Sequence, residues 1–330
     1  MSETPLLSVR GLSVEFLTRH GNVSAVDSVS FDLRAGETLA LVGESGSGKS
    51  ACALALMGLT TLPGRVAGGQ VLFDGQDLLA APPHVLEDLR GNRIAMVFQD
   101  PMSALNPLLA IGTQIDEVLV RHTGLDRAQR RARIIELLGQ VGIPKPAERL
   151  DRLPHEFSGG QRQRILIAMA LACDPQILIA DEPTTALDVT IQAQILDLLA
   201  ELKQRLGLAM LLVTHDLGVV AKVADRVAVM YAGRLVELAN ADALFAEPAH
   251  PYTAGLLRAT PRLTDTRHRM IAIDGVPPDL RLRRSHCDFA PRCPGADAAC
   301  AQRPALRDIG QGRLAACVRP SAPVWMQDHD

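Results

Sequence analysis

The chain has 330 residues, 47% of them hydrophobic and 22% charged, which suits one large folded domain with a smaller one beside it. Its 34 lysines and arginines are balanced by 37 aspartates and glutamates, so the net charge is −3. This balance argues against a nucleic-acid partner, because a phosphate backbone is bound through excess positive charge. The longest apolar run, residues 165–173, is too short to cross a bilayer, and the first residues lack the features of a signal peptide. We therefore expect a cytoplasmic protein.

The first predicted strand, residues 38–42, leads into a glycine-rich loop. The loop, Gly43-Glu44-Ser45-Gly46-Ser47-Gly48-Lys49-Ser50, fits the P-loop pattern GxxxxGKS/T, and a helix-prone segment follows it. Glycines let consecutive backbone N–H groups face a triphosphate, and the helix N-terminus attracts negative charge. We expect Lys49 to reach the β- and γ-phosphates of ATP and Ser50 to bind Mg²⁺. A glycine-rich turn without a ligand is the less favoured interpretation.

Three more apolar segments predict strands at residues 94–98, 177–180 and 211–213. Helical stretches separate them, which indicates an α/β fold with a buried and mostly parallel sheet. One of these stretches, residues 127–140, predicts a helix with Asp126 as its N-cap and Gly142 after its end. Its arginines are interpreted as a solvated face and receive no role.

Polar side chains follow these three strands directly. The carboxyl ends of parallel strands meet at one edge of a sheet, so we expect the following residues near the P-loop: Gln99, Asp181, Glu182 and His215. Asp181 is assigned to Mg²⁺, directly or through water, and Glu182 to the general base or to positioning of the attacking water. Gln99 is expected to sense the metal ion and the water, and His215 to hold the γ-phosphate.

The segment FSGGQRQR, residues 157–164, resembles the LSGGQ signature of ABC ATPases, with Phe157 where leucine is usual. Alone, SGGQ is a weak signal that also fits a polar turn before a helix. Its place between a P-loop and an apolar-Asp-Glu segment is similar to the order in the ABC family. The resemblance implies a head-to-tail dimer in which the signature caps the γ-phosphate held by the other subunit. The residues concerned are Ser158, Gly159, Gly160 and Gln161, with Asp188 as the D-loop aspartate.

Longer segments narrow the resemblance. VGESGSGKS, VFQDPMSALNP, IADEPTTALDVTIQAQIL and HPYTAGLL resemble the ATP-binding subunits of oligopeptide and dipeptide importers, and the likeness extends from about Leu6 to Pro320. It implies a second, homologous ATPase subunit in a heterodimer, two membrane permease subunits that contact residues 100–107, and an extracytoplasmic solute-binding protein. The chain would then be peripheral, at the cytoplasmic face of the inner or plasma membrane. In many ABC ATPases an aromatic residue near the N-terminus stacks on adenine; here His20 stands at that position, and Phe16 is an alternative.

The C-terminal part contains four cysteines, Cys287, Cys293, Cys300 and Cys317. Their spacing differs from the CxxC pairs of common zinc modules, but four thiols in a reducing compartment indicate a soft metal site. The segment also resembles the extension of peptide-importer ATPases, some of which hold a four-iron (4Fe-4S) cluster. We expect that cluster, with Zn²⁺ as the alternative. We place a P-loop ABC ATPase core at residues 1–245, with a helical subdomain at about 100–173, and a cysteine-rich extension at 246–330.

The main hypothesis is thus a transport ATPase for short peptides. The same role for nickel or another small solute is the nearest alternative. A soluble ABC ATPase acting on nucleic acid is less favoured, because the chain has one cassette and no excess of basic residues. A binding-only regulator is less favoured still, because both Glu182 and His215 are present.

Overall fold

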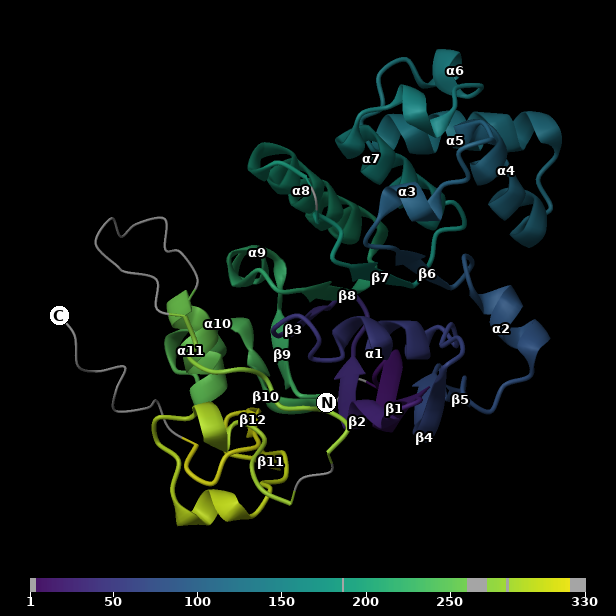
Figure 1. Ribbon diagram of the computed structural model, residues 1–330. Helices are drawn as coiled ribbons and strands as arrows, with labels where there is room; N and C mark the ends of the chain where they lie inside the picture. Colours follow the sequence, from purple (N-terminus) through teal and green to yellow (C-terminus); the bar gives the residue numbers. More distant parts are fainter. Residues whose placement is uncertain (1–3, 186, 260–271, 283–284, 321–330) are drawn as a thin grey trace. The chain divides into compact units, whose positions relative to one another are not determined.

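The computed structural model describes residues 4–185, 187–259, 272–282 and 285–320. The chain forms two compact units (Figure 1). The first comprises Met1–Ala80 and Val213–Asp330, and the second comprises Ala81–Leu212. In the part of the chain that is described, no helix combines the length and the apolar character needed to cross a membrane.

The first unit contains an antiparallel sheet of order β2-β1-β4-β5. Its strands are β1 (Leu7–Thr18), β2 (Gly21–Leu33), β4 (Gly64–Phe73) and β5 (Gln76–Asp77). Leu7 and Val9 are buried, and after a register shift so are Leu12 and Val14, so each part of β1 keeps one face on the core. Helix α1 (Lys49–Leu56) packs against β1 and β2. This sheet was not predicted from the sequence.

A second set of strands in the first unit has the order β11-β12-β10-β9-β3. The strands are β3 (Thr38–Val42), β9 (Arg226–Tyr231), β10 (Arg234–Asn240), β11 (Arg307–Asp308) and β12 (Leu314–Ala315). Strands β3 and β9 are parallel, and β10 pairs antiparallel with both β9 and β12. Because β12 comes from the cysteine-rich segment, that segment adds its own strands to the sheet that carries the P-loop.

Helices and short 3-10 turns complete the first unit. They are α9 (Leu217–Val223), α10 (Ala241–Ala246), α11 (Pro251–Ala259), η2 (Ala290–Arg292) and η3 (Ala298–Ala301). Residues from β9, α10, α11 and the C-terminal segment form one apolar core, which includes Val229, Tyr231, Leu244, Tyr252 and Phe289. The three rings of Tyr231, Tyr252 and Phe289 lie within 4.5–5.4 Å of one another, centroid to centroid, in tilted and edge-on contacts that aromatic pairs prefer.

The second unit combines parallel strands with a group of helices. Strands β6 (Ile94–Val97) and β7 (Ile177–Asp181) pair in parallel, and β8 (Ala209–Thr214), which crosses the boundary between the units, follows β7 in the sheet. The helices are α2 (Pro83–Leu89), α3 (Pro101–Ala104), α4 (Ile111–His122), α5 (Arg127–Gln140), α6 (Pro146–Arg149), η1 (Pro154–Glu156), α7 (Gly159–Ala170) and α8 (Val189–Leu206). The apolar faces of α4, α5, α7 and α8 share one core with residues of β6, β7 and β8.

The predicted strands are all present, as β3, β6, β7 and β8. The helix predicted at residues 127–140 is α5, and Asp126 caps it through a capping box with Gln129. The α/β fold class with a mostly parallel sheet is confirmed. The predicted domain boundary near residue 245 stays a prediction, and parts of the predicted extension, residues 260–271, 283–284 and 321–330, lie outside the described residues.

Candidate nucleotide site

Close packing makes two glycines of the P-loop necessary. A Cβ atom on Gly43 would lie 2.1 Å from the carbonyl oxygen of Met230, and one on Gly48 would lie 2.0 Å from that of Ala25. Both residues also have positive φ angles, 155° and 103°, which side-chain-bearing residues rarely adopt. Any other residue at these positions would push the loop away from its neighbouring strands.

Lys49 is the first residue of α1 and is held inside the loop. Its side chain is nearly buried, with 4% of the residue exposed, and its Nζ donates hydrogen bonds to the carbonyl oxygens of Gly43 (2.9 Å) and Glu44 (3.1 Å). The nearby hydroxyl of Ser47 is buried and has no hydrogen-bond partner among the described residues. Ser50 is half-buried in the first turn of α1. The loop therefore presents an ammonium group, hydroxyls and a helix N-terminus together, which suits a polyphosphate.

Glu44 binds residues that lie far along the chain, which the sequence did not predict. Its carboxylate accepts two hydrogen bonds from Arg292, at 2.8 and 3.0 Å, and its backbone N–H donates to the hydroxyl of Tyr252 at 2.8 Å. Tyr252 belongs to the HPY segment at the start of α11, and Arg292 precedes Cys293. No local sequence pattern marks these contacts, because their partners are 208 and 248 positions apart.

The HPY segment is itself deeply buried. The carboxylate of Glu237 accepts hydrogen bonds from the backbone N–H groups of Ala249 (2.8 Å) and His250 (2.9 Å), which directly precede α11, and burial raises the pKa of Glu237. The ring Nδ1 of His250 accepts from the N–H of Tyr252 at 3.0 Å. Burial lowers the pKa of His250 to about 3, so this histidine is neutral in the folded protein at neutral pH.

His215 follows β8 and is exposed. The next residue, Asp216, begins α9 as its N-cap, and its carboxylate accepts from the N–H groups of Gly218 (2.8 Å) and Val219 (3.2 Å). A strand end that is fixed by a capped helix holds the residue at the junction in place. His215 thus occupies the predicted position after its strand.

In the second unit, Gln99 and Glu182 lie together, as their positions after β6 and β7 predicted. The side-chain amide of Gln99 donates to the Glu182 carboxylate at 3.0 Å, and the hydroxyl of Thr185 donates to the same oxygen at 2.9 Å. Glu182 has a positive φ of 44°, an uncommon conformation that is often found at functional sites. Asp181, at the end of β7, is 5% exposed. The predicted proximity of these residues to the P-loop stays a prediction, because the P-loop belongs to the other unit.

The SGGQ segment forms the N-terminus of α7. Ser158 caps the helix: its hydroxyl accepts from the N–H of Gln161 at 3.3 Å, and the Gln161 side chain accepts from the N–H of Ser158 at 3.2 Å. A Cβ on Gly160 would lie 2.7 Å from Ile191 of α8, so the glycine permits close helix packing. Phe157, which replaces the usual leucine, is buried at 3% exposure.

Asp188 is the N-cap of α8. Its carboxylate accepts from the N–H of Ile191 at 2.9 Å, and Ile191 is the residue that packs on Gly160. Ser158, Gly159 and Asp188 are all exposed. The signature residues and the D-loop aspartate therefore lie at the N-termini of two packed helices, although their predicted contact with a second subunit stays a prediction.

The C-terminal cysteines lie near one another. Burial raises the pKa of Cys293, and the neighbouring thiols of Cys287, Cys300 and Cys317 raise it further. The N–H of Cys287 also donates to the carbonyl of Cys300 at 3.0 Å. Over the described ranges, however, no group of three or more histidine, cysteine or acidic side chains is arranged around a single metal-ion position. The predicted metal at these cysteines, a 4Fe-4S cluster or Zn²⁺, therefore stays a prediction.

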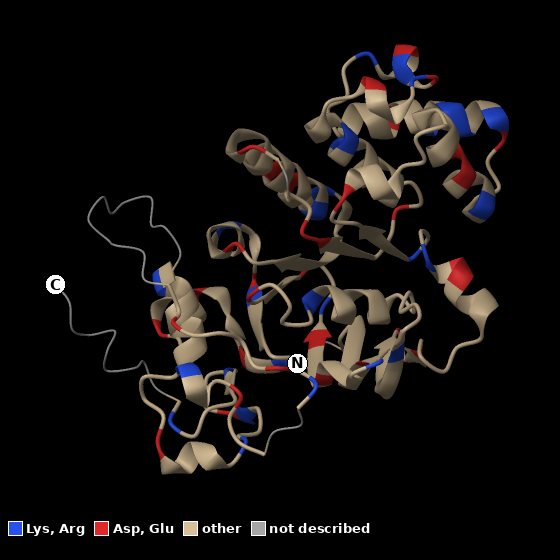
Figure 2. Ribbon diagram, viewed as in Figure 1, with Lys and Arg blue, Asp and Glu red and all other residues tan. Residues whose placement is uncertain are grey.

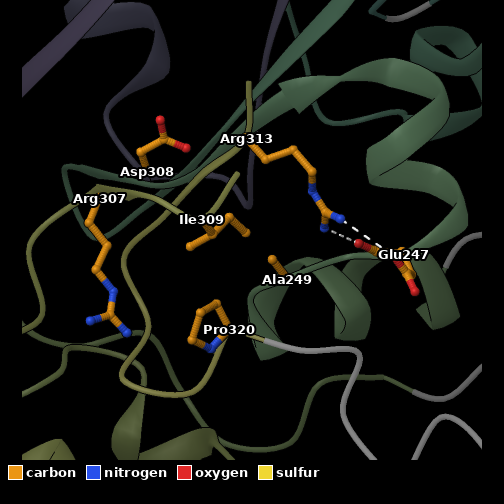
Figure 3. Close-up of a pocket in the computed structure, with 7 residues that line it drawn as sticks. All are labelled: Glu247, Ala249, Arg307, Asp308, Ile309, Arg313 and Pro320. Carbon is orange, nitrogen blue, oxygen red and sulfur yellow. Dashed lines mark hydrogen bonds and ion pairs between the residues drawn. The ribbon is translucent and has the colours of Figure 1, made fainter. Parts of the chain in front are cut away.

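A surface pocket in the C-terminal part of the first unit contains charged residues (Figure 3). Glu247, Arg307, Asp308 and Arg313 line it together with Ala249, Ile309 and Pro320. Arg313 is paired with the carboxylate of Glu247 at 3.5 Å, and Arg307 donates to the carbonyl of Cys317 at 3.2 Å. Because these arginines already bind protein groups, we assign no ligand to the pocket.

Acidic and basic residues are interspersed in both units (Figure 2). The arginines of α5 are the most visible basic group, and two of them are paired: Arg130 with Asp116 at 2.6 Å and Arg133 with Asp174 at 2.6 Å. The side chains of these two are only 18% and 20% exposed, whereas Arg127 and Arg131 are exposed, so the solvated face predicted for α5 holds for part of its arginines.

Comparison with known proteins identifies two family regions. Residues 26–185 match the model of the ABC transporter family, and residues 236–300 match the oligopeptide/dipeptide transporter C-terminal region. The chain is 50% identical to the oligopeptide transport ATP-binding protein OppD of Escherichia coli (strain K12), covering 96% of this chain and 93% of OppD. It is 52% identical to the dipeptide transport ATP-binding protein DppD of Bacillus subtilis (strain 168), over 98% of this chain and 95% of DppD.

Solved structures also match. A dimeric ATP-binding cassette in a post-hydrolysis state with ADP and Pi is 27% identical, with a TM-score of 0.64, over 71% of this chain and 98% of the cassette. A second dimeric structure, of a bacterial ABC transporter cassette, is 28% identical with the same TM-score of 0.64, over 71% of this chain and 98% of that cassette.

Proposed function

The chain belongs to the family of ABC transporter ATP-binding subunits, and we propose that it hydrolyses ATP to power the import of dipeptides and oligopeptides. One observation carries the substrate class: relatives named for oligopeptide and dipeptide transport are about half identical over nearly the whole chain. The match includes the C-terminal region of such transporters, residues 236–300. That region contains the buried HPY segment, so the matched residues include part of the core of the first unit.

The P-loop binds the triphosphate of ATP in this proposal. Its backbone N–H groups, the α1 N-terminus and Lys49 supply the positive potential, and the buried Ser47 hydroxyl gains a phosphate oxygen as its partner. Ser50, Gln99 and Asp181 would hold Mg²⁺, whose charge would offset that of the phosphates. His215 holds the γ-phosphate. Phe16 and His20 are the two candidates for the adenine contact: Phe16 is half-buried in β1, where a Cβ on Gly64 would lie 2.9 Å from its ring, and His20 is exposed.

Glu182 acts as general base or positions the attacking water. One carboxylate oxygen accepts hydrogen bonds from Gln99 and Thr185, and these bonds orient the carboxylate for work on a water molecule. Gln99 thus reports on the metal ion and the water through the same carboxylate. The positive φ of Glu182 directs this residue away from the path of the preceding strand.

We further propose that Ser158, Gly159, Gly160, Gln161 and Asp188 act on ATP held by a second subunit. Both helices that carry them begin with exposed, capped N-termini, which attract anions. The related cassettes were solved as dimers. A homologous second ATPase subunit, giving a heterodimer, is the partner we expect.

The membrane partners contact the segment after Gln99. Around α3, three large apolar side chains are exposed, Phe98 by 38%, Met102 by 48% and Leu108 by 83%. Exposed apolar groups of this kind suit a protein interface. Two permease subunits and an extracytoplasmic solute-binding protein complete the proposed transporter, and the chain is peripheral at the cytoplasmic face of the membrane.

Uptake by cells that carry the transporter tests the substrate class. We expect a chromosomal Lys49→Ala substitution to abolish uptake of labelled dipeptides and tripeptides, because Lys49 is needed to bind ATP. Lys222→Ala, on the exposed face of α9, is the matched control and retains uptake. If peptide uptake persists in Lys49→Ala cells while uptake of nickel is lost, nickel replaces peptides as the substrate.

The cysteine residues are proposed to hold a 4Fe-4S cluster. The thiols of Cys287, Cys300 and Cys317 are close enough to Cys293 to raise its pKa, and a cubane cluster spaces its thiolate ligands farther apart than a single tetrahedral zinc ion does. The cluster would stabilise this small segment when bound. Anaerobically purified protein should be brown and contain iron, and should lose both properties in a Cys293→Ala variant. Colourless protein without iron would reject the cluster.

A further inference from the structure

All three polar groups of Glu44 are engaged, and two of them bind the C-terminal region. The carboxylate binds Arg292, the backbone N–H binds the hydroxyl of Tyr252, and the backbone carbonyl accepts from Nζ of Lys49. Glu44 therefore connects Arg292 and Tyr252 to the lysine that is expected to reach the phosphates. Every link in this connection lies within the first unit.

The guanidinium of Arg292 has an acceptor for each of its donors. Its Nε donates to the carbonyl of Asp274 (3.0 Å), Nη1 to Glu44 and to the hydroxyl of Tyr231 (3.3 Å), and Nη2 to Glu44 and to the carbonyl of Ile273 (3.2 Å). Arginine has five N–H groups in a planar fork, and all of them are used here. The side chain is 5% exposed.

Two aromatic rings also contact the guanidinium of Arg292. The guanidinium carbon lies 5.7 Å from the centroid of the Tyr231 ring and 6.0 Å from that of Phe289. Tyr231 and Phe289 also pack on Tyr252. The two residues that bind Glu44 therefore share one apolar support, and a change in that support would reach both contacts at once.

We propose that Arg292 and Tyr252 are positioning residues of the ATP site, through which the C-terminal region sets the affinity of the P-loop for ATP. A saturated, partly buried ion pair of this kind allows one geometry, so it holds Glu44, and through its carbonyl Lys49, in a fixed place. A P-loop without this restraint must be ordered by the nucleotide itself. That ordering lowers affinity, but it leaves Glu182, in the other unit, untouched.

The test is a comparison of nucleotide affinity and turnover in the full-length protein. We expect Arg292→Gln to raise the Kd for a fluorescent ATP analogue and the KM for ATP by roughly tenfold. Arg292→Lys keeps the positive charge but loses the planar guanidinium, and it should have the same effect. Tyr252→Phe should act in the same direction, while kcat stays within about twofold of the parent. Arg281→Gln is the matched control, because Arg281 is an exposed arginine of the same region whose ion pair, with Asp279, does not involve the P-loop.

A double substitution separates a specific contact from a general loosening. If Arg292 acts through Glu44, the variant with both Glu44→Gln and Arg292→Gln should have nearly the Kd of the single variants. Additive effects would overturn the proposal, and so would an unchanged Kd in folded Arg292→Gln protein. If that variant does not fold, Arg292→Lys and Tyr252→Phe decide, and normal affinity in both overturns it.

The inference rests on the P-loop as the ATP site, and the two can fail separately. Normal ATP affinity in Lys49→Ala protein would remove the ATP site itself. Normal affinity in the Arg292 and Tyr252 variants, with weak binding by Lys49→Ala, would remove only the positioning role.

Discussion

The P-loop and the SGGQ segment are both glycine-rich loops that lead into a helix, yet different kinds of contact hold them. Glu44 of the P-loop is held by Tyr252 and Arg292, which are 208 and 248 positions away. Ser158 of the SGGQ segment is held by Gln161, three positions away. The first loop depends on the fold of its whole unit, whereas the second largely carries its own support.

This difference suits the two proposed tasks. A loop that binds ATP directly gains affinity when distant parts of the chain fix it in advance. A helix N-terminus that meets ATP on another subunit must work as a local, exposed surface, and a capping box provides that. Regulation by the C-terminal region is therefore expected to act on ATP binding in the first unit, and not on the signature in the second.

The largest expected effect concerns two residues, one in each unit: Lys49 is proposed to bind ATP, and Glu182 to promote its hydrolysis. Glu182→Gln removes the proposed base but keeps the shape of the side chain, so phosphate release should fall by about a hundredfold or more while ATP still binds. Lys49→Ala should instead weaken the binding of ATP itself. Titration with ATP and a phosphate-release assay measure the two quantities.

Glu201→Gln is the control for this pair. Glu201 is an exposed glutamate of α8 in the same unit as Glu182, so its substitution should change neither affinity nor turnover. Unaltered phosphate release by Glu182→Gln would remove the assignment of the base.

A smaller effect concerns the long-range support of the P-loop at low pH. His250 is neutral in the folded protein, with a pKa of about 3 against an ordinary 6.5. Between these values the unfolded chain binds a proton that the native state does not, so stability is lost as the pH falls through this window. From pH 7 to pH 5, the loss attributable to His250 is about 2 kcal/mol.

His250→Asn should remove this part of the acid sensitivity, because the asparagine oxygen can still accept from the N–H of Tyr252 but does not titrate. Glu237, which accepts from the backbone of His250, has a raised pKa and so contributes the opposite pH trend in both proteins. Urea unfolding at both pH values measures the difference, with the exposed His84→Asn as control. Equal acid sensitivity in His250→Asn and the parent would contradict the prediction.

Local patterns account for what could be predicted from the sequence. The capping signal at Asp126 and the spacing of Ile134, Leu137 and Leu138 gave the bounds of α5, because both depend on residues within one or two turns. The buried strands β3, β6, β7 and β8 were visible as short apolar runs. The antiparallel sheet was missed, because β1 is interrupted by register shifts, for instance between Val9 and Leu12, that break the strict alternation of a strand.

In the candidate site, too, the residues marked by local patterns could be predicted, and those placed by long-range contacts could not. Gln99 and Glu182 could be paired because each ends a neighbouring parallel strand, and the structure joins them at 3.0 Å. Arg292 could not be found in this way. In the sequence it is one arginine among the cysteines, and only the folded chain brings it to Glu44. Tyr252 was part of a recognised segment, but its hydroxyl's contact with the P-loop is a tertiary feature without a local signal.

The smallest expected effect tests whether the signature really carries its own support. Ser158 of α7 and Asp126 of α5 form capping boxes of the same type in the same unit, so Ser158→Ala and Asp126→Ala should each lower the free energy of unfolding by about 1 kcal/mol. Only Ser158→Ala should also lower ATP hydrolysis, because only Ser158 is proposed to meet ATP across a dimer. Urea unfolding and phosphate release on both variants measure the two effects. If Asp126→Ala reduces hydrolysis as much as Ser158→Ala does, the loss reflects stability alone, and Ser158 acts on α7 and not on the nucleotide.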